Sequence, residues 1–125
     1  MLSVEHISEK ERASLLYFTV FVYLWKAGKS EYETIIKDLI RISEKLIQKG
    51  IIKSKFRRSE IFREIQRLRE WRIINEQTGS LYYDLKQDYR SHLNQVDEVG
   101  KHLTRNNNKR ETVLAIVQDF LIIKE

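Results

Sequence analysis

Three side chains with hydrogen-bonding heads recur at helical spacing in the middle of the chain. Arg63, Gln66 and Arg67 lie at i, i+3 and i+4, so they share one face of a helix that we expect over residues 59–70. Arg and Gln can each make paired hydrogen bonds to the edge of a base, Arg to guanine and Gln to adenine. The opposite face is apolar and should be buried; its residues are Ile61, Ile65 and Leu68.

Positive charge is concentrated around this helix. Residues 41–72 hold eleven Lys or Arg and four Glu, a local charge of +7, whereas the rest of the chain carries −2. Cations that lead into the helix could neutralise phosphates. These residues are Lys53, Lys55, Arg57 and Arg58. Ser59 follows as the expected N-cap, because its hydroxyl can accept a hydrogen bond from a backbone N–H of the first turn. A solvated helix face is the alternative explanation of the charge.

Catalytic and metal-binding patterns are missing from the sequence. There is no cysteine, so disulfides and thiolate metal ligands are excluded. Glu98 and His102 are one helical turn apart, but no third ligand has the spacing that a zinc site needs. No glycine-rich phosphate loop and no nucleophile motif occur. We therefore expect no enzymatic activity, with no catalytic residues, no metal, no cofactor and no small-molecule ligand.

Beyond Trp71 the helical periodicity gives way to two short runs rich in β-branched and aromatic residues. They flank the polar residues 76–80, and we expect a β-hairpin over residues 73–85. A basic helix followed directly by a hairpin resembles the winged helix-turn-helix family. The residues that carry this resemblance, which covers about a quarter of the chain, are Ile65, Leu68, Trp71, Ile73, Ile74 and the hairpin at Gly79.

The resemblance implies an arrangement on DNA. In that family the helix enters the major groove, and the hairpin, called the wing, touches the backbone or the minor groove beside it. The three hydrogen-bonding residues of the helix would then face base edges. The tip of the wing would be formed by Gln77, Thr78 and Ser80. A further strand often pairs with the wing in such domains, and we expect it at residues 51–53.

Long helices should surround this unit, because proline is absent and glycine is scarce. Ser8 and Ser30 each precede a Glu by three residues, a capping-box spacing that predicts the start of a helix. These two helices should end near Gly28 and Gly50. Asn108 precedes Glu111 by the same spacing and is the expected cap of a final helix.

The expected fold class is mainly α with a small β-hairpin (α+β), in a single domain of residues 1–125. It is a winged helix-turn-helix with extra N- and C-terminal helices, with a core over about 8–88 and a C-terminal helical extension over about 89–125. The most apolar run, residues 15–25, is eleven residues long and too short to span a bilayer. No secretory signal is evident, so we expect a cytoplasmic protein without a membrane partner.

Apolar residues are in excess toward both ends of the chain. Residues 15–25 are apolar on nearly every side of their helix, and residues 113–123 end in an uncovered apolar run. Because exposed apolar patches mark interaction surfaces, we expect a homodimer built through the terminal helices. The alternative is a monomer in which the last helix covers the first.

Two functions from different classes fit these patterns. The first is a sequence-specific double-stranded DNA-binding protein, acting as a transcription regulator or as a plasmid or viral partition or replication factor. The second is a winged-helix protein–protein interaction module that does not bind DNA. Glu60, Glu64 and Glu70 favour the second, because acids on the helix would repel phosphates. RNA binding is a third function, suggested by six Tyr and two Trp, although no RNA-binding motif is present.

Overall fold

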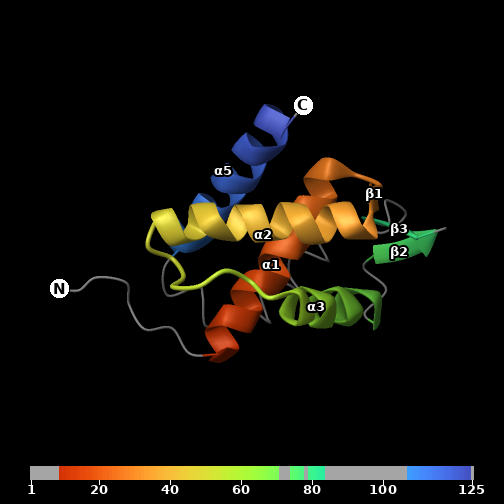
Figure 1. Cartoon of the computed structure of the whole chain (residues 1–125), viewed down its shortest axis with the longest axis horizontal. Coiled ribbons are helices and arrows are strands. Elements are labelled where there is room, and N and C mark those ends of the chain that lie inside the picture. Colours follow the sequence, from red (N-terminus) through yellow and green to blue (C-terminus); the bar gives the residue numbers. More distant parts are fainter. Residues whose placement is uncertain (1–8, 71–73, 78, 84–106, 125) are drawn as a thin grey trace.

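The computed structural model describes residues 9–70, 74–77, 79–83 and 107–124, and it is mainly helical with a small antiparallel sheet (Figure 1). In chain order the elements are α1 (Glu9–Ala27), β1 (Ser30–Glu31), α2 (Tyr32–Gln48), α3 (Arg58–Glu70), β2 (Ile74–Gln77), β3 (Ser80–Tyr83) and α5 (Asn107–Lys124). This arrangement confirms the expected α+β class. Within the described ranges, no helix combines the length and the apolar character needed to cross a bilayer.

Helix α1 is the centre of the fold. Every residue from Leu15 to Leu24 is buried, on all sides of the helix. It contacts α3, α5 and β3, and in Figure 1 it runs diagonally through the middle of the molecule between α3 and α5. A helix that is apolar all round must be covered on most sides, and here the chain itself supplies the cover. One of the two apolar surfaces that suggested a homodimer is therefore covered by the chain itself. The other lies at the end of α5, where Ile122 and Ile123 are exposed.

Strands β2 and β3 form a hairpin within the predicted range. Ile74 lies opposite Tyr83 and Gln77 lies opposite Ser80, so two residues make the turn. Gly79 supplies one of them with a positive φ of 81°, a conformation that tight hairpin turns require and that glycine adopts at no steric cost.

The third strand is β1, and the expectation of a strand at residues 51–53 is wrong. β1 pairs with β3, giving the antiparallel order β1-β3-β2. Residues 51–53 are irregular, because the N–H of Ile51 donates to the Leu46 carbonyl at 2.9 Å and closes α2. Ile51 and Ile52 are both buried, whereas neighbouring residues of a strand point to opposite faces.

The expected N-caps of α2 and α3 are also wrong. Ser30 lies in β1, and its hydroxyl donates to the backbone carbonyl two residues before it at 3.1 Å. α2 begins two residues later without a side-chain cap. Ser59 lies inside the first turn of α3, which begins at Arg58. The capping group is instead Glu60, whose Oε1 accepts the backbone N–H of Arg57 at 2.8 Å, as in one half of a capping box.

Other expected boundaries have mixed outcomes. α1 ends before Gly28, as predicted, and the Gly28 N–H donates to the Leu24 carbonyl at 3.0 Å. Asn108 lies inside α5, which begins at Asn107, so it is not the cap of that helix. Ser8, the remaining residues of the predicted hairpin range and the boundary between core and extension near residue 88 lie outside the described residues.

A buried carboxylate joins three helices. Asp38 of α2 accepts a hydrogen bond at 2.6 Å from the Tyr23 hydroxyl of α1 and another at 2.6 Å from the Lys124 amine of α5. Burial and the bond to Asp38 raise the pKa of Tyr23, so its hydroxyl remains a donor. The charge of Asp38 is thereby paired, which is the condition for keeping an ion in a protein interior.

Candidate nucleic-acid interface

Helix α3 buries the face that the sequence predicted. The side chains on that face are at most 1% exposed, namely Ile61, Ile65 and Leu68. They pack in the core, where α3 contacts α1 and α2. On the opposite side Ser59 and Arg63 are exposed and Gln66 is half-buried. Arg63 has no ion-pair partner among the residues that the structure describes.

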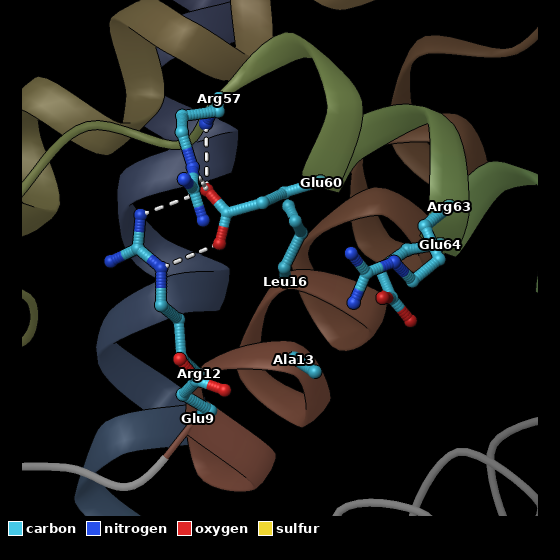
Figure 2. Close-up of a pocket in the computed structure, with 8 residues that line it drawn as sticks. All are labelled: Glu9, Arg12, Ala13, Leu16, Arg57, Glu60, Arg63 and Glu64. Carbon is cyan, nitrogen blue, oxygen red and sulfur yellow. Dashed lines mark hydrogen bonds and ion pairs between the residues drawn. The ribbon is translucent and has the colours of Figure 1, made fainter.

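A cleft of about 230 Å³ separates the start of α3 from the start of α1 (Figure 2). Arg57 and Arg63 line it beside α3, and Ala13 and Leu16 contribute an apolar part from α1. Its lining contains three arginines and three glutamates. Because these charges balance, the cleft lacks the excess positive charge that would hold a phosphate. The cleft itself is therefore not the expected site of a phosphate.

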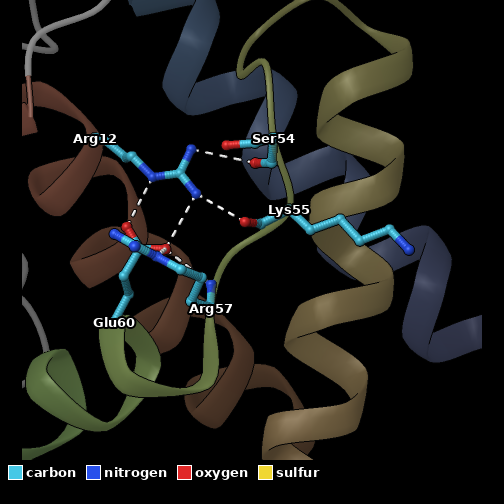
Figure 3. A network of polar contacts seen from close by, with 5 residues as sticks. All are labelled: Arg12, Ser54, Lys55, Arg57 and Glu60. Atoms are coloured by element: carbon cyan, nitrogen blue, oxygen red, sulfur yellow. Dashed lines mark hydrogen bonds and ion pairs between the residues drawn. The ribbon is translucent and has the colours of Figure 1, made fainter.

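Arg12 of α1 anchors the connection between α2 and α3 (Figure 3). Its guanidinium donates to Oε2 and Oε1 of Glu60 at 2.8 and 3.1 Å. The same head donates to the carbonyls of Ser54 and Lys55 at 3.2 and 2.9 Å. The connection has nine residues, against about three to four in a usual helix-turn-helix turn. These contacts, the Arg12 clasp, hold the longer connection in one path, and the Lys55 side chain points away from them (Figure 3).

Glu60 is ionised and turned inward. Burial alone would raise its pKa, but hydrogen bonds from the Arg12 side chain and the Arg57 backbone lower the pKa to about 2. Both carboxylate oxygens are used within the protein. Glu60 therefore does not present an acid to an incoming phosphate, contrary to the expectation from sequence. Its partner Arg12 lies 48 positions away in the chain.

The cations that lead into α3 are exposed, as the sequence suggested: Lys53, Lys55, Arg57 and Arg58. Some of them meet acids of α2. The Lys55 amine lies 3.3 Å from Glu44, and Arg58 is paired with Glu33. Exposed ion pairs of this kind contribute little to stability, so a phosphate can replace the carboxylate at small cost. Lys53 has no ion-pair partner in the described part of the chain.

Glu64 is a buried acid that the sequence analysis placed at the surface. It is 1% exposed, and Arg67 Nη1 approaches its Oε1 to 3.4 Å without forming a hydrogen bond. Burial raises the pKa of Glu64, although the positive charges of Arg67 and Arg63 oppose the change. The sequence held a signal for this position. Glu64 is three residues after Ile61 and four before Leu68, so it borders the apolar stripe.

Arg67 is less available than predicted. Its side chain is 38% exposed and lies against Glu64, and its guanidinium carbon is 5.9 Å from the centre of the Tyr17 ring. A cation over an aromatic face is attracted to it, so both neighbours hold Arg67 toward the protein. Among the predicted contact residues of α3, Ser59, Arg63 and Gln66 therefore remain on its outer face.

The hairpin is tied to α2 and α3. Arg69 donates to Glu76 Oε1 at 3.0 Å, linking α3 to β2. The Tyr32 N–H at the start of α2 donates to the Gly79 carbonyl at 3.2 Å. Two of the predicted wing-tip residues end the strands at the turn, Gln77 and Ser80. The third, Thr78, lies outside the described residues.

No family model, no curated protein and no solved structure matches this chain. The candidate interface therefore rests on geometry. It runs from the exposed cations of the connection, along the outer face of α3, to the hairpin that Arg69 ties to this helix.

Proposed function

We propose that this chain is a sequence-specific double-stranded DNA-binding protein with a winged helix-turn-helix fold. Helix α3 enters the major groove, and the β2–β3 hairpin is the wing that touches the backbone or the minor groove beside it. The biological role is that of a transcription regulator, or of a partition or replication factor of a plasmid or virus. No cofactor takes part in this function.

The observation that carries the proposal is the outer face of α3. Its apolar side is fixed in the core, which leaves Ser59, Arg63 and Gln66 on the side away from it. Arg63 and Lys53 have no ion-pair partner in the described ranges, so a base or a phosphate would not have to displace an acid from them. Beyond α3 the chain forms a hairpin, and a third strand pairs with it, as the family resemblance implies.

The proposed contacts fall into three groups. Phosphates are bound by the exposed cations Lys53, Lys55, Arg57 and Arg58. Base edges are read from the outer face of α3 by Ser59, Arg63 and Gln66. Arg67 joins them when its side chain moves away from Glu64. The wing contributes Gln77, Thr78 and Ser80, which are neutral. Neutral side chains suit hydrogen bonds to the backbone more than deep insertion into the electronegative minor groove.

The alternative function, a protein–protein interaction module, loses part of its support. It rested on three acids of α3, and two of them do not present a free carboxylate to a partner. Glu60 is held by the Arg12 clasp, and Glu64 is buried. Glu70 alone of the three is exposed.

Salt-dependent binding to duplexes tests the proposal. A site selected from a randomised duplex pool should bind more tightly than a scrambled duplex, and both affinities should fall as salt rises. Lys53→Ala should weaken binding to both duplexes, because it removes a phosphate contact. Lys26→Ala is the matched control, since this exposed lysine lies at the far end of α1, about 20 Å along the helix from Arg12. The absence of duplex binding at low salt would refute the proposal.

A further inference from the structure

Phe62 is an exposed aromatic side chain within the proposed reading helix. Three large apolar side chains are exposed among the described residues: Phe62 at 47%, Ile122 at 69% and Ile123 at 77%. The two isoleucines belong to the final turn of α5. Phe62 instead lies in the middle of α3, next to Arg63 and one turn before Gln66. It therefore adjoins the groups proposed to reach base edges.

The Phe62 ring is supported from one side. The Tyr32 ring at the start of α2 meets it edge to face, with 6.4 Å between ring centres and 66° between ring planes. Tyr32 is itself held by the hydrogen bond from its N–H to the Gly79 carbonyl. One turn before Phe62, Arg58 is paired with Glu33, the neighbour of Tyr32. A side chain that is already held in this way loses little freedom when a ligand covers its open side.

The chemistry of the major groove offers few partners for such a ring. Phosphates and most base-edge atoms are polar, and the one apolar group in the groove of unmodified DNA is the methyl at C5 of thymine. 5-Methylcytosine carries a methyl at the same ring position. We infer that Phe62 contacts the C5 methyl group of a pyrimidine, beside the base that Arg63 or Gln66 reads. This inference rests on the proposed function, because it requires α3 in the major groove.

The size of the effect follows from the burial of one methyl group. Transferring a single apolar carbon from water to an apolar contact changes an affinity by about four-fold. Phe62 is 47% exposed, so part of its side chain is free to cover one such group. The expected preference is therefore about four-fold for one methylated position of the site.

Removing single methyl groups from the DNA tests this contact. After a binding site has been selected from a randomised duplex pool, each thymine is replaced in turn by deoxyuridine, which lacks only the methyl. We expect one position at which wild type loses about four-fold in affinity and Phe62→Ala loses nothing. Phe62→Leu should retain part of the preference, because it keeps an apolar contact. Ile123→Ala, which removes a more exposed apolar side chain that lies outside α3, should keep the wild-type dependence on the methyl group.

A second arm identifies the source of the methyl group. Each cytosine of the selected site is replaced in turn by 5-methylcytosine. A Phe62-dependent loss on deoxyuridine substitution assigns thymine, and a Phe62-dependent gain on cytosine methylation assigns 5-methylcytosine. Circular dichroism and the thermal midpoint of Phe62→Ala establish that the variant is folded, which its half-exposed position favours.

The outcomes separate this inference from the proposed function. If wild type binds the selected duplex but no methyl substitution changes its affinity, the methyl contact is overturned and DNA binding stands. Equal methyl effects in wild type and Phe62→Ala would assign the contact to another residue and overturn the inference as well. A wild type that binds no duplex at low salt would overturn both.

Discussion

Replacing Glu60 by Gln should destabilise the protein at neutral pH and have little effect in acid. Glu60 receives two hydrogen bonds from the Arg12 guanidinium and one from the Arg57 N–H. The substitution keeps the size of the side chain, removes its charge and replaces one of the two accepting oxygens by an NH2 donor. The loss at neutral pH therefore measures how strongly the Glu60 carboxylate holds α3 to Arg12 of α1.

The magnitude follows from the pKa of Glu60. Its contacts outweigh the effect of burial and lower the pKa from 4.5 to about 2. At about 1.4 kcal/mol per pH unit, this difference corresponds to about 3 kcal/mol of stability that depends on the charge. The side chain is still 14% exposed, so water screens part of the interaction. We expect Glu60→Gln to lower the free energy of unfolding by about 2 kcal/mol.

The pH dependence gives the sign of the effect. Because the pKa of Glu60 is lower in the folded state than in the unfolded state, its stabilisation is fully present above the unfolded-state value of 4.5. As the pH falls from there to about 2, the carboxylate of the folded protein becomes protonated and the stabilisation is lost. Urea-unfolding curves recorded between neutral pH and about pH 2.5 should therefore show wild type and Glu60→Gln converging in acid.

A matched control uses another acid that is paired with a cation. Glu44 pairs with Lys55 at the surface, and its side chain is 49% exposed, so Glu44→Gln should change the free energy of unfolding by less than about 0.5 kcal/mol. A Glu60→Gln variant that is as stable as wild type at neutral pH would show that the Glu60 carboxylate contributes nothing to the Arg12 clasp. An equal loss at neutral and acid pH would show that the charge is not its cause.

The remaining predictions concern the neighbouring acid, the DNA contacts and self-association. Glu64→Gln should stabilise the protein by about 1 kcal/mol at neutral pH. The gain in stability should shrink in acid, because burial raises the pKa of Glu64 and its carboxyl group is then protonated in the folded protein as well. A loss of stability in urea unfolding would refute this. Arg63→Ala should weaken binding to the selected duplex by about 1–3 kcal/mol and relax the preference for particular bases. Lys55→Ala should weaken binding to all duplexes alike and reduce the dependence of binding on salt. If Arg63→Ala lost equal affinity for selected and scrambled duplexes, base reading by Arg63 would be contradicted. Sedimentation equilibrium at micromolar concentration should show a homodimer that Ile122→Ser with Ile123→Ser weakens, and a single 15.1 kDa species in wild type would refute the dimer.

Those parts of the fold that depend on local periodicity were predictable. Residues 59–70 repeat apolar side chains at helical spacing, and the structure places a helix there with the predicted residues in the core. The hairpin likewise follows from Ile73 and Ile74 before Gly79 and from the run Leu81-Tyr82-Tyr83 after it. In both cases a pattern within about a dozen residues decides which side is buried.

Features that depend on distant partners were not predictable. Arg12 and Glu60 are 48 positions apart, and nothing in the sequence near either residue indicates the other. β1 has only two residues, which is too short for an alternating pattern, so the third strand was misplaced. Glu64 could have been recognised as buried from its spacing to Ile61 and Leu68, but its charge argued for the surface.

Helix ends usually open and close more readily than helix centres, because their last backbone groups lack partners within the helix. In α5 this freedom is restrained, because the Lys124 amine supplies the cation for the buried Asp38. Each opening of the last turn of α5 leaves that carboxylate with the Tyr23 hydroxyl as its one remaining partner among the described residues. Fraying of α5 therefore costs free energy at the buried contact that joins α1 and α2. We expect amide hydrogen exchange in the last turn of α5 to become slower as the stability of the whole core increases.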